Sequence, residues 1–396
     1  MVTPGALDGL TVIDMSRILA GPWAGMTLGD LGANVIKVEV PGDGDVTRGY
    51  PPFWNGQSTY FLSINRNKRS ITVNLESEAG RDLIREMAST ADILIESFRT
   101  GAMEAWGLGS ETLMASNPRL IYCAISGVGR EGPDKDRAGV DLLMQAYAGL
   151  MSVTGEPGRV PVRTGTSVID LTAAVNAVQG ILAALYVREK TGKGQRVDSS
   201  LLGAAVSWMS YHLTGYFGTG NLPQPMGAFH PSVAPYGAYP TKDGLIVIAV
   251  GLDSSWKRFC AAVERPDLLR HPLLARNADR IANRAFQDET LIEILATKTA
   301  QEWAEVMDAH GVPASPINTV DTVVNLPQVL QQELVIDNPH PDVPNLRTQG
   351  IAIKMSHTPG TVRMPPPRLG EHTDEILAEF GKSAEEIAVL HAEGAV

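Results

Sequence analysis

Residues 10–38, LTVIDMSRILAGPWAGMTLGDLGANVIKV, carry the pattern that decides the fold. Leu10–Met15 and Asn34–Val38 are short apolar runs rich in β-branched residues, which is typical of buried strands. Pro22–Leu31 lies between them and is predicted to form a helix with proline in its first turn. A strand, a helix and a second strand in this order predict a parallel sheet.

The same alternation continues through the first half of the chain. Ser70–Asn74, Asp92–Glu96 and Leu120–Ile125 are further strand candidates, and Glu78–Ser89 is a helix candidate. Short strands separated by helical patterns favour a parallel sheet with helices on both faces. We therefore predict the α/β fold class, with a Rossmann-like large domain.

Helices and then a smaller domain are expected in the second half. Predicted long helices span Asp141–Ser152, Asp170–Thr191 and Ser200–Phe217, and residues 218–235, rich in Gly, Pro, Asn and His, are a candidate linker. Beyond it, the Asp-Gly step in Thr241–Gly244 predicts a hairpin turn.

Capping boxes mark two helix starts near the end of the chain. Thr299–Glu302 opens a helix of the predicted small domain, and Ser383–Glu386 opens one in the tail. That tail is too short to be a domain by itself. We predict a large domain over residues 1–224, a small α+β domain over 225–326, and a return of 327–396 to the large domain.

The charge balance limits the functional classes. The 396 residues include 33 Lys plus Arg and 44 Asp plus Glu, a formal net charge of −11. Acidity argues against non-specific binding to nucleic acid or to an anionic membrane, because both depend on a basic field. Leu171–Val187 is apolar but carries polar residues at helical spacing, which favours a packed helix over a membrane span. The beginning of the chain lacks a signal-peptide pattern, so a cytoplasmic location is expected.

Several familiar catalytic patterns do not occur in the sequence. There is no nucleophile elbow, metalloprotease helix or Walker A motif, and Cys123 and Cys260 are too few for a four-cysteine zinc site. Gly127, Gly129 and Gly132 match a dinucleotide fingerprint, but Pro133–Arg137 follows where an apolar helix should open. We therefore predict no metal, nicotinamide or flavin cofactor.

Isolated basic residues suggest local anion sites. Arg17 and then Pro22, at a helix start, follow the first strand, where a helix N-terminus either holds a phosphate or simply makes a tight turn. The run Arg66–Arg69 is either a solvated loop or a site for a phosphate or carboxylate. Arginines of the same kind are Arg48, Arg130 and Arg163.

Asp170 is the leading candidate for chemistry. It begins the long apolar helix and follows a loop that contains Gly165. A plain helix N-cap explains an aspartate at this position. A carboxylate nucleophile, held by amide donors and the helix dipole, is the other explanation. The residue pattern does not choose between these interpretations.

Ordered matches to a known family extend over nearly the whole chain. They are Leu7–Asp14, Ala20–Pro22, Leu31–Glu39, Asn67–Ile71, Ser126–Gly127, Gly132-Pro133, Thr191–Gln195 and Leu369–Thr373. In these residues the chain resembles the class III coenzyme A transferases, which include formyl-CoA transferase, carnitine CoA transferase and α-methylacyl-CoA racemase. The resemblance implies a Rossmann-like large domain and a small domain, in a homodimer whose two subunits interlock.

The resemblance also implies a covalent mechanism that needs neither metal nor ATP. Asp170 matches the family's catalytic aspartate, which attacks the donor thioester to give a mixed anhydride. The released CoA thiolate then captures the aspartyl group, and the acceptor carboxylate takes its turn. The substrates implied are an acyl-CoA and a small carboxylic acid.

The family's CoA contacts carry over by motif to the strand ends of the large domain. They are Arg17, Ile18, Leu19, Ala20, Val73, Asn74, Leu75, Ser97, Phe98, Arg99, Ser126, Val128, Gly129 and Arg130. The chain departs from formyl-CoA transferase at Val40, where that enzyme has an arginine, and at Gly227–Ser232, which replaces a four-glycine loop. Formate-oxalate exchange is therefore not expected.

The resemblance is greatest to the branch that uses succinyl-CoA and dicarboxylic acids. We expect Arg48, Arg66 or Arg163 to hold the distal carboxylate, with the loop of His230 closing over the thioester. One alternative is a racemase, whose catalytic His-Asp pair is reduced here to Val140 and Asp141, and valine cannot titrate. A catalytically silent CoA-binding subunit is the other alternative.

Overall fold

The computed structural model describes residues 4–396, which form two compact units. The first unit comprises residues 4–150, 164–215 and 327–396. The second comprises Met151–Arg163 and Tyr216–Leu326.

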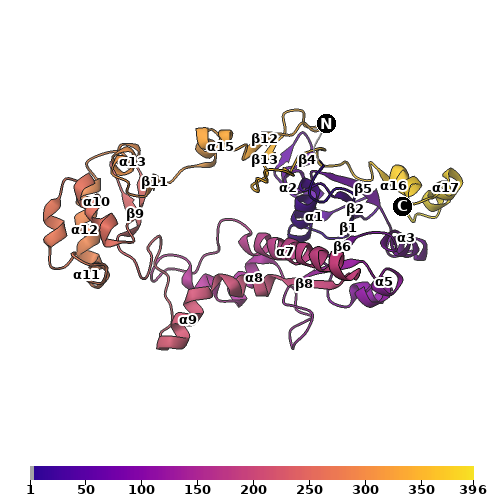
Figure 1. The fold of residues 1–396 in the computed structure, drawn as a ribbon, viewed down its shortest axis with the longest axis horizontal. Coiled ribbons are helices and arrows are strands. Elements are labelled where there is room, and N and C mark those ends of the chain that lie inside the picture. The colour runs from indigo at the N-terminus through magenta and orange to yellow at the C-terminus, as the bar shows by residue number, and fades with distance from the viewer. Residues whose placement is uncertain (1–3) are drawn as a thin grey trace. The chain divides into compact units, whose positions relative to one another are not determined.

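A parallel sheet, six-stranded within residues 4–396, organises the first unit (Figure 1). Its spatial order is β5 (Lys68–Thr72), β2 (Asn34–Glu39), β1 (Thr11–Asp14), β6 (Ile93–Glu96), β7 (Ile121–Ser126) and β8 (Arg196–Ser200). In chain order this is 3-2-1-4-5-6, the Rossmann arrangement, whose winding reverses between β1 and β6. The predicted fold class is confirmed, and β8 is a strand that the sequence pattern did not reveal.

Helices cover both faces of this sheet (Figure 1). Helices α1 (Ala20–Asp30) and α7 (Val168–Thr191) pack against each other on one face. Helices α3 (Glu78–Ala88), α5 (Ser110–Ser116), α16 (Thr373–Glu379) and α17 (Ala384–Ala392) share an apolar core with the other. The unit also contains the short helices α2 (Thr59–Ile64), α4 (Ala102–Ala105), α6 (Asp141–Tyr147), α8 (Leu201–Trp208) and α15 (Pro327–Gln331). Two hairpins complete it, β3 (Phe53–Trp54) with β4 (Gln57–Ser58), and β12 (Val335–Asp337) with β13 (Arg347–Gln349), together with a 3-10 helix at Val46–Gly49.

The long helices differ in detail from those predicted. Helix α6 ends at Tyr147, two residues before Gly149, whose φ of +83° is a left-handed conformation that stops a helix. The predicted helix Ser200–Phe217 is divided at Met209 into α8 and α9 (Ser210–Thr219). Helix α7 is long and apolar enough to cross a membrane, yet one face of it is buried within the first unit.

The second unit is built on an antiparallel sheet, three-stranded in the described chain. Its order is β11 (Ala314–Pro316), β10 (Leu245–Ala249) and β9 (Tyr236–Pro240), and the predicted Asp-Gly turn joins β9 to β10. Its helices are α10 (Asp253–Ala262), α11 (Asn277–Ala282), α12 (Arg284–Leu295), α13 (Ala300–Ala309) and α14 (Val320–Val323). The capping boxes at Thr299 and Ser383 are confirmed, because each side chain accepts from the amide three residues later.

Lys68 and Asp14 form a fully buried ion pair between β5 and β1. Lys68 Nζ donates to Asp14 Oδ2 at 2.8 Å, to Asn65 Oδ1 at 2.9 Å and to the carbonyl of Pro22 at 2.7 Å. The ammonium group therefore uses all of its donors. Burial lowers the pKa of Lys68 to about 8, although the charge of Asp14 opposes this effect.

The basic run Arg66–Arg69 is neither a solvated loop nor a ligand site, because its side chains are buried against internal partners. Arg66 donates to both carboxylate oxygens of Asp30, at 2.9 and 2.7 Å. Arg69 pairs with Glu375 and Glu379 of α16 at 2.8 and 2.7 Å. Arg66, expected to hold a substrate carboxylate, is thus occupied inside the protein.

The glycines of α1 let this helix lie directly on the buried charges. A Cβ atom on Gly25 would stand 2.7 Å from Asp14 Oδ2, and one on Gly29 would stand 2.8 Å from the carbonyl of Asn67. Larger side chains at these positions would force the helix away from the sheet. Gly21, four residues before Gly25, is approached as closely, since a Cβ atom on it would stand 2.1 Å from Ser16 Cβ.

Replacing Lys68 with Met should therefore lower the free energy of unfolding by about 3–5 kcal/mol, because it leaves the Asp14 carboxylate buried without a partner. The exposed Lys193 offers a matched control, since Lys193→Met should change stability by less than about 0.5 kcal/mol. Urea denaturation measures both. Equal stabilities for the two variants would contradict the importance of the buried pair.

Candidate active site

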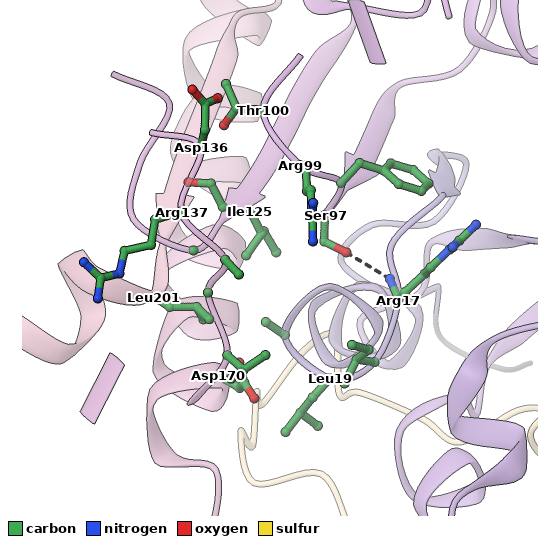
Figure 2. A pocket seen from close by; sticks show the side chains of 18 of the residues that line it. Arg17, Leu19, Ser97, Arg99, Thr100, Ile125, Asp136, Arg137, Asp170 and Leu201 are labelled. Atoms are coloured by element: carbon green, nitrogen blue, oxygen red, sulfur yellow. Dashed lines mark hydrogen bonds between the residues drawn. The ribbon is translucent and has the colours of Figure 1, made fainter. Parts of the chain in front are cut away.

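A cavity of about 600 Å³ lies at the carboxyl ends of β1, β6 and β7 in the first unit (Figure 2). It opens where the winding of the sheet reverses, which is where open α/β sheets bind ligands. The predicted site residues that line it are Arg17, Ile18, Leu19, Ala20, Ser97, Phe98, Arg99, Ser126 and Asp170. Figure 2 shows Asp170 and Leu19 at one end of the cavity, and Thr100 and Asp136 at the other.

Buried charges shape the wall that follows β1. The amide of Ser16 donates to Asp14 Oδ1 at 3.0 Å, and the Ser16 carbonyl accepts from Lys37 Nζ at 3.2 Å. Two residues later, Ile18 has a φ of +71°, a conformation that β-branched residues rarely adopt. The bonds at Ser16 hold the chain at the point where this unusual turn begins.

Asp170 lies in the first turn of α7 and lines the cavity. Ser167 occupies the N-cap position, so the N-cap interpretation of Asp170 does not apply. The Asp170 carboxylate accepts no hydrogen bond from any residue between 4 and 396. Burial, followed by the nearby charge of Asp141, raises the pKa of Asp170 to about 7.

Asp141 is a neighbour of Asp170 whose helix-capping contacts the sequence pattern did not reveal. It begins α6, and its Oδ2 atom accepts from the amides of Ile169 and Asp170 at 2.9 and 3.4 Å. Asp141 thus caps α7 from another helix, while Gln145 donates to its second oxygen. The Tyr60 phenol feels the same charges, since burial and then the charge of Asp170 raise the pKa of Tyr60 to about 12.

Cations outnumber carboxylates along the cavity. Within the described residues its lining includes Arg17, Arg99, Lys135 and Arg137, against Asp136 and Asp170. Lys135 and Arg137 were not predicted as site residues. They reach the cavity because two glycines meet: a Cβ on Gly127 would stand 2.6 Å from the Cα of Gly139.

Other predicted CoA contacts lie outside this cavity. Val73 and Leu75 line a much smaller one, next to Val40. The Asn74 amide donates to the carbonyl of Ala395 at 2.8 Å. Val128, Gly129 and Arg130 are also absent from the described lining, and the Arg130 guanidinium pairs instead with Glu96 and Glu104.

The other residues predicted to bind substrate differ in whether their side chains are already bonded within the protein. Arg48 donates to Glu39 through two nitrogens, each at 2.7 Å, and its guanidinium stacks on Phe61. Like Arg66, it is therefore occupied internally. Arg163, in the second unit, is exposed and makes no ion pair with any residue from 4 to 396. His230 is in the second unit, where its Nδ1 atom accepts from the amide of Ser232 at 3.1 Å.

The model of CoA-transferase family III matches residues 7–373. The chain belongs to this family. The human succinyl-CoA:glutarate CoA-transferase is 39% identical over 374 residues, covering 94% of this chain and 85% of that protein. The succinate–glutarate CoA-transferase of Agrobacterium fabrum is 37% identical over 388 residues, covering 94% and 95%. The crystal structure of a CAIB/BAIF family protein from Brucella suis has a TM-score of 0.85 at 37% identity, covering 95% of this chain and all of that one.

Family membership confirms the predicted family and class of enzyme, a CoA-transferase, with CoA as a substrate. The glycine motif at Gly127, Gly129 and Gly132 has a conformational explanation. Gly129 and Gly132 adopt φ values of +108° and +91°, and Gly127 permits the contact with Gly139. These glycines therefore serve the path of a loop beside the cavity.

The pKa of Asp170 predicts a stability change with pH. Between the usual value of 3.8 and about 7, the native state binds more protons than the unfolded chain, so the Asp170 carboxyl lowers stability as pH rises. Asp170→Asn removes this effect, so its free energy of unfolding should exceed that of the wild type by on the order of 2 kcal/mol above pH 7. Denaturant titrations at pH 5 and pH 8 measure this difference in stability, and a difference that does not change with pH would contradict the raised pKa.

Proposed function

We propose that this enzyme transfers coenzyme A from succinyl-CoA to a dicarboxylic acid through covalent intermediates on Asp170. The observation that carries the proposal is the Asp170 carboxyl, half-buried without a hydrogen bond in a cavity rich in cations. Relatives named as succinyl-CoA:glutarate, succinyl-CoA–D-citramalate and succinyl-CoA:mesaconate CoA-transferases support this donor and this class of acceptor.

The surroundings of Asp170 suit a nucleophile. A carboxylate without hydrogen bonds keeps its lone pairs available, and partial burial removes the water that would otherwise stabilise its charge. Its pKa near 7 leaves it largely ionised above neutral pH. Asp141 adds a negative charge while it holds the amides at the beginning of α7, so Asp141 orients the nucleophile and raises its basicity.

Each step exchanges one acyl bond for another and needs no proton or electron donor. The Asp170 carboxylate attacks the thioester carbonyl of succinyl-CoA, the C–S bond breaks, and the CoA thiolate leaves a succinyl-aspartyl anhydride. The thiolate attacks the aspartyl carbonyl, expels succinate and forms an aspartyl-CoA thioester. The acceptor carboxylate attacks this thioester to give a second anhydride, and the thiolate attacks its acceptor carbonyl, which releases acyl-CoA and free Asp170.

The cations of the cavity fit the phosphates of CoA. Arg17 and Arg99, together with Lys135 and Arg137, supply positive charge, and the beginning of α1 adds the positive end of a helix dipole. Ile18, Leu19 and Ala20 supply an apolar wall beside Asp170. This arrangement supports a binding mode with the phosphates among the cations and the thioester at Asp170.

Mixing the enzyme with succinyl-CoA and a panel of acids tests the activity. Glutarate, mesaconate or citramalate should give the corresponding CoA thioester, and hydroxylamine should trap a modification at Asp170 that mass spectrometry detects. Asp170→Asn should lower kcat by at least about a thousandfold. Asp136→Asn, which changes the other carboxylate of the cavity lining, is the matched control and should not remove the trapped adduct.

The alternatives give different results in the same experiment. A racemase would invert a 2-methylacyl-CoA without any acceptor acid, and a silent subunit would form no product. Val140 occupies the position of the racemase histidine and lines the cavity, which disfavours α-proton exchange. Transfer that persists in Asp170→Asn would refute the assigned nucleophile.

Arg163 is the arginine that we propose to read the distal carboxylate of the acceptor. Unlike Arg48 and Arg66, it is exposed and has no ion-pair partner within the described range. Arg163→Ala should raise KM about tenfold for dicarboxylates and leave KM for monocarboxylates unchanged. The exposed Arg159 is a nearby control, and equal effects on both classes of acid would refute this role.

We also propose that the enzyme is a homodimer, as the family resemblance implies. Helices α6, α7 and α8 expose large apolar side chains, which a second copy of the chain would cover. These residues are Leu142, Leu143, Tyr147, Tyr186, Val187 and Trp208. Sedimentation at the mass of one chain would refute the dimer.

A further inference from the structure

We propose that Glu96 is a positioning residue for CoA binding, because its carboxyl holds two loops that shape the cavity, one after β6 and one after β7. Glu96 does not line the cavity itself and lies at the last position of β6. The inference rests on the proposed function, since it takes the cavity as the CoA site.

The Glu96 carboxyl binds one loop with each oxygen. Its side chain is 1% exposed. Oε2 accepts from the amide of Phe98 at 2.8 Å, in the loop after β6. Oε1 accepts from Arg130 Nη1 at 2.7 Å, in the loop after β7. Arg130 also donates to Glu104 of α4, so its guanidinium is held at both ends.

The loop after β6 also holds the residues that follow β1, which form the neighbouring wall of the cavity. Ser97, between Glu96 and Phe98, accepts from the amide of Arg17 at 3.0 Å through its hydroxyl (Figure 2). The Arg17 guanidinium lies 5.0 Å from the centre of the Phe98 ring. Fixing the backbone of Phe98 therefore also positions Arg17, one of the cations proposed to bind phosphate.

The loop after β7 transmits the anchoring to the opposite wall. Arg130 belongs to the segment 127–132, in which the Gly129 amide donates to Ser126 Oγ at 3.1 Å. Gly127 of this segment is in close backbone contact with Gly139. Movement of Arg130 would therefore shift the segment that carries Lys135, Arg137 and Val140 along the cavity.

Because the Glu96 carboxyl is buried, its contacts with both loops depend on the ion pair with Arg130. Desolvation raises the pKa of Glu96 to about 7, while the Phe98 amide and the charge of Arg130 lower it. A buried ion pair adds little to stability compared with well-packed apolar side chains. The geometric effect on two loops is therefore the larger consequence of this pair.

The measured quantity is the Kd of free CoA, determined by calorimetry in an Asp170→Asn background where no chemistry occurs. Adding Glu96→Gln keeps an acceptor for the Phe98 amide but removes the charge that holds Arg130, and should weaken CoA binding about tenfold. Asp30→Asn is the matched control, because it breaks a similarly buried pair, with Arg66, whose residues do not line the cavity. Both changes should lower thermal stability, but Asp30→Asn should leave the Kd unchanged.

A double-mutant cycle separates positioning by Arg130 from direct contact with CoA. Arg130→Met should weaken CoA binding about as much as Glu96→Gln, and the double variant no more than either, because both changes remove one ion pair. A further loss in the double variant would show that Arg130 binds CoA directly and would overturn the proposal. An unchanged Kd in Glu96→Gln, or an equal loss in Asp30→Asn, would overturn it as well.

Steady-state kinetics of the enzyme with Asp170 intact provide a second readout. Glu96→Gln should lower kcat/KM for succinyl-CoA about tenfold and change kcat at saturation by less than about twofold, since the nucleophile is untouched. A fall in kcat alone would contradict positioning of CoA. If the Asp170→Asn parent itself binds no CoA, both the proposed function and this inference fail, whereas loss of the Glu96 effect alone leaves the proposed function intact.

Discussion

The buried ion pair between Lys68 and Asp14 is the constraint on which the first unit depends. It joins strands that lie on either side of β2, and its lysine also holds the carbonyl of Pro22 at the beginning of α1. Removing either partner leaves a charge with no access to water, which is far more costly than losing a surface pair. The first strand, the edge strand and the first helix are therefore fixed relative to one another.

Two further buried pairs extend this constraint toward the cavity. Lys37 contacts Asp45 at 2.9 Å, and Arg48 contacts Glu39 at 2.7 Å. Because every cation in this group has a carboxylate partner, an acidic protein keeps an interior that is close to neutral. The basic side chains of the cavity lining, by contrast, are left with a positive excess. Acidity of the whole molecule and a local site for a small polyanion are thus compatible, since field strength near a ligand depends on the nearest unpaired charges.

Much of the fold could be predicted from the sequence because it depends on local patterns. The alternation of strands and helices, the turn at Asp243-Gly244 and the capping boxes depend on residues within a few positions of each other. The strand Arg196–Ser200 escaped prediction because it is mostly polar and only its place beside β7 makes it a strand. Arg66 and Asp30 are 36 positions apart, and no local rule reveals their pairing.

The candidate site was predictable to the extent that its residues follow strand ends or motifs. Asp170 and the residues after β1 and β6 were recognised in this way, and the structure places them around one cavity. Asp141 escaped because its task is to cap a helix that begins 27 positions later, which requires knowing that α6 and α7 pack together. Its effect on Asp170 is a property of the assembled helices.

The C-terminal segment protects the exposed side of β5. Ser70 bonds through its amide and carbonyl to His372, and the Thr72 amide donates to Thr373 Oγ1, so the free edge of the sheet is already occupied. An uncovered edge strand invites pairing with other chains. During synthesis the whole second unit emerges before these residues do. The nascent first unit therefore has an open sheet edge until these residues are made, and at that stage it is more prone to pair with other chains than the finished protein is.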